Sequence, residues 1–221
     1  MFIGHFGVGF AAKTAAKKPS LGTLFLAAQF LDLLWPILLI LGIEKVEIGT
    51  GSNAFHTLNF VHYPFTHSLL AVIIWGVIFG LIYYFIKKDS KSAVWCGVLV
   101  VSHWFLDLLV HRPDLPLFPG SNSPLFGFDL WDSFYGTVIV EVAIFLIGVY
   151  LYLKVTKPKN KTGTISLWAL IFFLLLVYFM NALGPAPDSV DSIGYVGLSQ
   201  FLLVGWAYWI DSNRFISSHS T

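Results

Sequence analysis

Long runs of apolar residues, separated by short polar segments, repeat along almost the whole chain. Six of these runs are apolar enough to cross a bilayer, for which a helix needs about 20 residues. They cover approximately residues 21–43, 64–86, 93–110, 136–153, 167–183 and 195–210. Residues 1–12 are also apolar but too short to span. The pattern predicts an all-α, polytopic membrane helix bundle of about six transmembrane helices, preceded by a short half-spanning or interfacial helix.

The polar segments between these runs alternate in charge. Net charges of +3, −1, +2, −2, +4 and −2 follow one another in segments 13–20, 44–63, 87–92, 111–135, 154–166 and 184–194. Cytoplasmic loops of membrane proteins are enriched in Lys and Arg. We therefore expect every basic segment, together with the C-terminal tail, on the cytoplasmic side of the plasma (inner) membrane. The alternation also supports six spans independently of hydropathy.

Composition excludes several classes of protein. The chain is 57% hydrophobic and 11% charged, whereas a soluble domain carries about 25% charged residues, and its mean hydropathy is +0.77. One cysteine, Cys96, excludes an internal disulfide. No basic block with interleaved aromatic residues indicates nucleic-acid binding. We expect a single integral membrane domain over residues 1–221, with membrane lipids as partners, and the sequence indicates no oligomeric state.

A few ionisable residues lie in or beside the predicted spans, where each costs about 3 kcal/mol to insert and is a functional candidate for that reason. They are His5, Asp32, His67, His103, Asp107 and Glu141, with His62 and His111 at helix ends. His103, Asp107 and His111 are spaced i, i+4 and i+8, so they share one helix stripe that can hold a metal ion. The alternative is a buried structural ion pair between Asp107 and a neighbouring histidine.

The predicted topology places these residues in the same outer half of the membrane. Pro64 suits the first turn of a helix, which puts His62 just before that helix and His67 one turn inside it. At a rise of about 1.5 Å per residue, His103 and Asp32 lie deeper. A half-spanning helix would carry His5 to the depth of Asp32, whereas an interfacial helix would keep it at the surface. The placements predict one outward-opening polar pocket.

Some of these segments are similar to those of a known family. The similar residues are Gly4-His5, Asp32, Phe65-Thr66-His67-Ser68-Leu69-Leu70, Ser102-His103 and Asp107. They resemble the LexA-regulated, membrane-bound predicted metal-dependent hydrolases, the YdjM-like proteins, which are grouped with zinc-dependent phospholipase C. The resemblance covers roughly residues 1–120 and implies metal ligands at His5, Asp32, His62, His67, His103 and Asp107. This chain departs from the family pattern in having a single acid, Asp32, on the first span.

The leading hypothesis is a membrane-embedded hydrolase that uses one to three zinc ions, or another divalent cation. It would act on a lipid, phosphoester or other ester substrate. Asp32, His67, His103 and Asp107 would be the core ligands, and Glu141 a general base. His5, His62 and His111 would be peripheral ligands or support the ligands. The alternatives are a metal or proton transporter or sensor, a haem protein with two axial histidines, and a scaffold without catalysis. The metal site belongs to about residues 1–120, and further helices follow at about 136–210.

Overall fold

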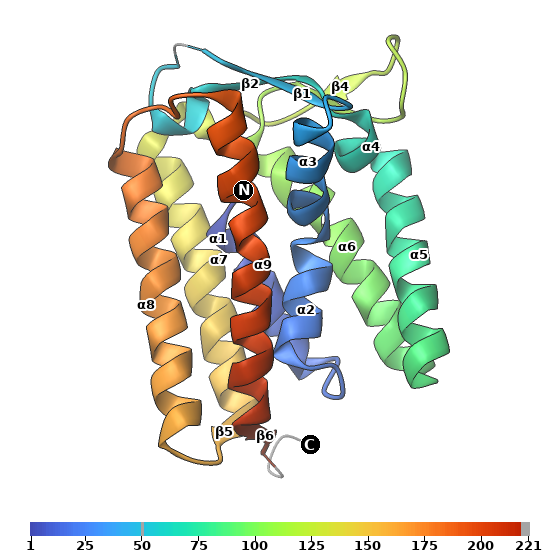
Figure 1. Ribbon diagram of the computed structural model, residues 1–221, viewed down its shortest axis with the longest axis vertical. Coiled ribbons are helices and arrows are strands. Elements are labelled where there is room, and N and C mark those ends of the chain that lie inside the picture. The colour runs from blue at the N-terminus through green and yellow to red at the C-terminus, as the bar shows by residue number, and fades with distance from the viewer. Residues whose placement is uncertain (50, 218–221) are drawn as a thin grey trace.

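The computed structural model describes residues 1–49 and 51–217. The described chain forms an elongated helix bundle with short strands at both ends (Figure 1). Its α-helices are α1 (Ile3–Ala11), α2 (Leu21–Ala28), α3 (Phe30–Ile40), α4 (Pro64–His67), α5 (Leu69–Lys87), α6 (Ser90–Val110), α7 (Phe134–Val155), α8 (Lys161–Leu183) and α9 (Val190–Ser212). Its strands are β1 (Lys45–Ile48), β2 (Leu58–His62), β3 (Leu115–Pro116), β4 (Leu125–Phe126), β5 (Thr156–Pro158) and β6 (Arg214–Ile216).

The predicted membrane helix bundle is confirmed. Within the described residues, five helices, α5 to α9, are long and apolar enough to cross a membrane. The bent pair α2 and α3 makes a sixth if it counts as one span. Its two helices meet at Gln29 with an angle of 56°. Pro36, inside α3, lacks the N–H that would donate to the Asp32 carbonyl, so the backbone ladder is interrupted near a candidate ligand.

Helix α1 lies inside the bundle, behind α9 in Figure 1, and packs mainly against α7 and α2. Ile3, Phe6 and Phe10 are fully buried in one of the two apolar cores, which also includes residues of α7, α8 and α9. Of the two alternatives for the N-terminal segment, the structure therefore has the helix embedded in the protein. An interfacial helix would expose its polar face to water.

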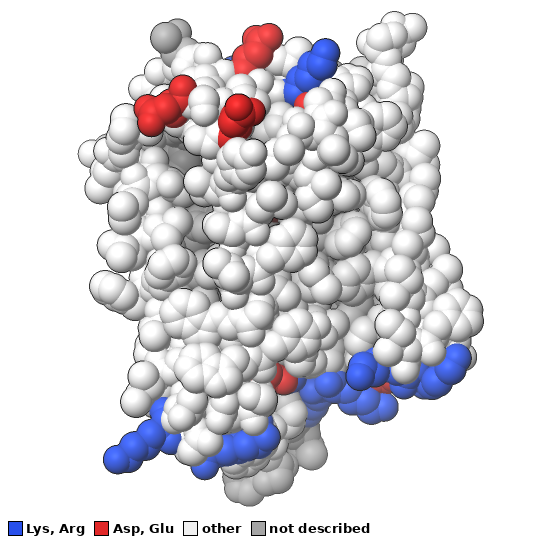
Figure 2. Space-filling model, viewed as in Figure 1, with Lys and Arg blue, Asp and Glu red and all other residues white. Residues whose placement is uncertain are grey.

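The two ends of the molecule differ in charge. Figure 2 shows most Lys and Arg side chains of that view at the end where β5 pairs with β6, and most acidic side chains at the opposite end. The acidic end carries the antiparallel hairpins β1–β2 and β3–β4. The helical periodicity of the sequence did not predict these short strands. Residues 218–221, the last part of the tail predicted to be cytoplasmic, lie outside the described residues.

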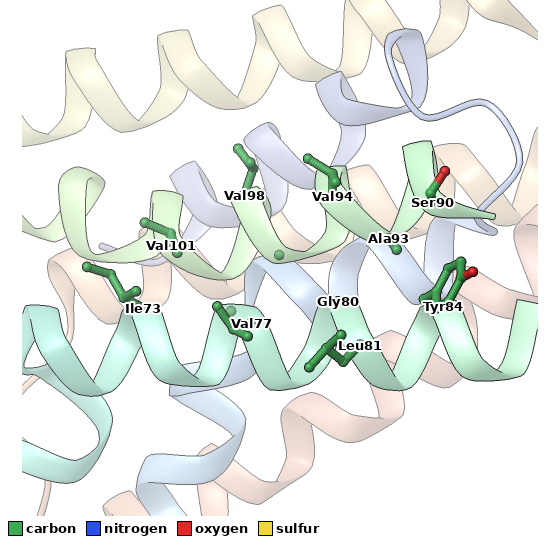
Figure 3. A pocket seen from close by; sticks show the side chains of 12 residues that line it. Ile73, Val77, Gly80, Leu81, Tyr84, Ser90, Ala93, Val94, Val98 and Val101 are labelled. Carbon is green, nitrogen blue, oxygen red and sulfur yellow. The ribbon is translucent and has the colours of Figure 1, made fainter. Parts of the chain in front are cut away.

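Helices α5 and α6 are packed tightly along most of their length. A Cβ at Gly76 would lie 2.9 Å from the Gly97 carbonyl oxygen, and one at Gly80 would lie 2.9 Å from that of Ala93. Beside this contact runs an apolar groove of about 580 Å³, lined by side chains such as Val77, Leu81 and Val98 (Figure 3). The groove contains none of the candidate metal ligands.

Candidate metal centre

Four helices bring five of the predicted residues together. His103 and Asp107 lie one turn apart on α6, and His5 comes from α1. Asp32 lies in the first turn of α3, just after the bend at Gln29. His67 ends the short helix α4, which starts at Pro64 and stops because Ser68 takes an extended conformation. The bend and the break in the helices thus direct Asp32 and His67 towards α6.

The ligand atoms of four of these residues lie close together. His103 Nε2 is 3.1 Å from Asp107 Oδ2 and 3.4 Å from Asp32 Oδ1. His67 Nε2 is 3.7 Å from each of the same two oxygens. In a tetrahedral site whose ligand atoms lie about 2.0–2.2 Å from the ion, neighbouring ligand atoms are about 3.3–3.6 Å apart. Two groups, Asp32–His67–His103 and His5–His103–Asp107, have the spacing needed to hold a metal, and they share His103.

The Nδ1 atoms of both central histidines face away from this cluster. His103 Nδ1 is 2.9 Å from the Ala28 carbonyl oxygen, which can only accept, so Nδ1 carries the proton. In a neutral ring, His103 Nε2 is then the acceptor nitrogen. It is buried with no hydrogen-bond partner among the described residues. His67 Nδ1 lies 2.7 Å from Thr66 Oγ1, again away from the carboxylates. The Nε2 atoms of two histidines and two carboxylates therefore face one another.

His5 lies on the other side of His103. The two imidazole rings stack with centroids 3.6 Å apart and planes 4° from parallel. His5 Nε2 is 3.1 Å from Asp107 Oδ1, which also accepts a hydrogen bond from the Met1 amino group at 2.6 Å. His5 Nδ1 is buried and lacks a partner among the described residues. Asp107 thus belongs to one group, through the contact of Oδ1 with His5, and also contacts His67 of the other group through Oδ2.

The remaining predicted residues lie outside the two groups of ligands. His111 is buried, and its Nδ1 is 2.9 Å from Asp114 Oδ1. His62 is exposed on β2 and pairs with Lys45 of β1. Glu141 is buried on α7, where Oε2 accepts backbone N–H groups from Phe2 at 2.8 Å and Gly4 at 3.3 Å. This carboxylate satisfies donors at the start of α1, which have no partner within that helix.

The sequence reasoning missed Glu44, which it counted only as a loop charge. Glu44 is 1% exposed and lies behind His67. Its carboxylate accepts hydrogen bonds from the Thr66 hydroxyl at 2.6 Å and from two backbone N–H groups. The acidic segment Glu44-Lys45-Val46-Glu47 gives no sign of this burial. In the sequence, Thr66 stands out only as part of the segment from Phe65 to Leu70 that resembles the family.

Access to the cluster is limited to one side. The side chain of Asp32 is 22% exposed, whereas those of His67, His103 and Asp107 are 5% exposed or less. A small molecule would therefore meet Asp32 first. The four side chains therefore form a largely buried set whose most exposed member is Asp32.

The described fold and cluster define a class: a helical membrane protein with several candidate spans and buried His/Asp groups that could hold a metal. A family model described as YdjM inner membrane protein matches residues 1–184. The chain belongs to this family of inner membrane proteins, and the resemblance noted in the sequence is confirmed. Comparison with curated proteins and comparison with solved structures each gave no match.

Proposed function

We propose that this chain is a metal-dependent hydrolase of the inner membrane that uses zinc or another divalent cation. One observation carries the proposal. The Nε2 atom of His103 lies 3.1 and 3.4 Å from carboxylate oxygens of Asp107 and Asp32 and makes no hydrogen bond to them. In the neutral ring, which is protonated at Nδ1, this nitrogen is an acceptor like the two oxygens. Acceptors held this close in a buried site repel one another, and a buried unpaired polar group is costly. A cation bound among these atoms would turn the repulsion into attraction.

The donor set fits zinc. Imidazole nitrogens and carboxylate oxygens are both zinc ligands, and no thiolate is needed. Asp32, His67, His103 and Asp107 would hold one ion. His5, His103 and Asp107 form an alternative triad, because the single free nitrogen of His103 can bind only one ion at a time. Carboxylates also make the site less suited to haem. A bound ion would supply Lewis acidity towards a phosphoryl or carboxyl ester oxygen.

The residues around the ion would orient it and exclude water. His103 is held by the Ala28 carbonyl, and the His5 ring covers its face. Asp32, the most exposed of the four, would meet the substrate first. A site within the bundle suits a lipid or lipid-like ester whose polar group enters from the membrane. General-base catalysis by Glu141 stays a prediction, because Oε2 already binds the start of α1.

The proposal is tested by metal content. Detergent-purified protein is analysed by plasma mass spectrometry beside His103→Ala, Asp107→Asn and His62→Ala. We expect stoichiometric zinc in the wild type and in His62→Ala, whose ring is exposed on β2, and loss of zinc in the other two variants. Absence of metal from correctly folded wild-type protein, even after zinc reconstitution, refutes the proposal.

Hydrolysis requires a second test. The zinc-loaded protein is assayed against phosphodiester, phosphomonoester and carboxyl ester lipids, with Asp32→Asn as the comparison. We expect turnover of one class that disappears in Asp32→Asn. A protein that holds zinc but hydrolyses none of these substrates would instead support a transporter, a sensor or a structural metal site.

The orientation belongs to the same proposal. The basic end would face the cytoplasm, which follows the positive-inside rule and opens the site on the opposite side. Cys96 is fully buried, so it should give little background in labelling. Ser121→Cys and Lys157→Cys place exposed thiols at opposite ends. In intact cells, a membrane-impermeant maleimide should label the first and spare the second, and the reverse pattern refutes this orientation.

A further inference from the structure

Three side chains form a hydrogen-bonded chain that runs from the acidic end of the molecule into the cluster. The Glu44 carboxylate is 1% exposed, and its Oε2 accepts the Thr66 hydroxyl at 2.6 Å. Thr66 Oγ1 is in turn 2.7 Å from His67 Nδ1. The opposite ring nitrogen of His67, Nε2, faces Asp32 and Asp107. Glu44 is therefore connected to the ligand atom without touching the ligand site.

The direction of each hydrogen bond in this chain is determined. A carboxylate only accepts, so the single hydroxyl hydrogen of Thr66 points to Glu44. Thr66 Oγ1 then has only lone pairs to offer His67, so His67 Nδ1 must carry the proton. In a neutral imidazole the other nitrogen is then unprotonated. The chain fixes the tautomer in which Nε2 can bind a metal.

We propose that Glu44 is a positioning residue which, through Thr66, holds His67 in its metal-binding tautomer. The inference rests on the proposed metal site and adds two residues to it. Such supporting partners orient a histidine and raise its basicity, and their loss costs about 10–100-fold in metal affinity. The Ala28 carbonyl does the same for His103, but with a backbone group that side-chain substitution cannot remove.

The variant Glu44→Gln should reverse the direction of the hydrogen bonds between residues 44, 66 and 67. Glu44 Oε1 accepts the backbone N–H groups of Phe65 at 2.8 Å and Thr66 at 2.9 Å. The glutamine oxygen must stay there, so its NH₂ group takes the place of Oε2 and donates to Thr66 Oγ1. The Thr66 hydrogen then turns to His67 Nδ1, and the proton of the ring moves to Nε2. The side chain at position 44 keeps its shape, while His67 changes from the tautomer protonated at Nδ1 to the one protonated at Nε2.

The experiment measures tautomer and affinity separately on the full chain. Nitrogen NMR of ¹⁵N-histidine-labelled, metal-free protein reports which nitrogen of His67 is protonated, with His67→Ala used for assignment. Zinc affinity is measured by competition with a chelator. We expect Glu44→Gln to move the proton to Nε2 and to weaken zinc binding by about 10–100-fold. Glu47→Gln, an exposed glutamate three residues further on, should change neither.

Thr66 provides the second pair of variants. Thr66→Ser keeps the hydroxyl and should behave as wild type, whereas Thr66→Val keeps the shape and should lose zinc affinity by the same factor. This pair decides the matter if Glu44→Gln does not fold. Wild-type tautomer and affinity in both Glu44→Gln and Thr66→Val would overturn the inference and leave the metal site standing. A wild type with the expected tautomer but no zinc binding would support this chain of bonds and refute the proposed function.

Discussion

The contact between α1 and α7 allows a prediction whose size can be worked out. Gly7 of α1 faces the backbone of α7, and a Cβ there would lie 2.7 Å from the Ile144 carbonyl oxygen. Ordinary contact begins at 3.4 Å, so Gly7→Ala forces the helices apart by 3.4 − 2.7 = 0.7 Å. Neither partner is a flexible side chain that could move aside. Overpacking of this kind costs about 1–3 kcal/mol.

Gly205→Ala is the matched control, because a Cβ at Gly205 of α9 meets nothing within 4 Å. Both substitutions gain helix propensity, about 1 kcal/mol. The difference between the two variants therefore isolates the overpacking term. At about 2–4 °C per kcal/mol for a chain of this size, Gly7→Ala should melt about 2–12 °C below Gly205→Ala.

Thermal unfolding in detergent, followed by circular dichroism, measures this difference, and zinc content is measured on the same samples. His5 lies two residues from Gly7 on α1, so displacement of the helix should also weaken any ion held by His5. Equal melting temperatures and equal zinc content in the two variants would refute the close packing of α1 on α7.

Three further predictions concern other parts of the molecule. Removing zinc with a chelator should lower the melting temperature by about 5–11 °C, since an ion at 100 times its Kd stabilises by about 2.7 kcal/mol; His103→Ala protein should not respond. Burial, together with Asp114, raises the pKa of Tyr63 above its value of about 10 in the unfolded chain. The neutral Tyr63 hydroxyl therefore stabilises the folded state below about pH 10, and this stabilisation is lost as the pH rises further. Tyr63→Phe should then be less stable near pH 7 and show a shallower alkaline decline, and parallel curves would contradict this. Arg214 donates to the Thr156 and Gly163 carbonyls at the basic end. Arg214→Met should therefore lower the free energy of unfolding by about 2–3 kcal/mol, measured by chemical unfolding.

The transmembrane framework could be predicted from the sequence because span length and charge alternation are local properties. Each predicted run corresponds to a helix, except that residues 21–43 are bent at Gln29 and residues 64–86 are broken at Ser68. Hydropathy does not detect such breaks, because the residues remain apolar on both sides. The breaks matter because they direct Asp32 and His67 towards α6.

The cluster itself was predicted in part. The i, i+4 spacing of His103 and Asp107 is a property of one helix, and it survives in the structure. Which other residues join them depends on contacts between helices. The β1–β2 hairpin, with strands too short for a clear period, carries His62 outward. The short connection between α3 and β1 turns Glu44 into the protein interior, although a glutamate in a polar loop is usually solvated.

The role of α7 explains why the metal-site half and the later helices belong together. A helix start buried in a membrane protein leaves N–H groups that water cannot reach, and each unsatisfied group costs several kcal/mol. Glu141 of α7 accepts two of these groups from α1, and Gly148 leaves room for the Gly7 carbonyl. Without α7, α1 could not stay embedded, and His5 would leave its place against His103. The family match runs to residue 184, past α7, as it should if this helix supports the site. Glu141→Leu tests this directly: it should release α1 and lower zinc binding, although Glu141 is in neither group of ligands.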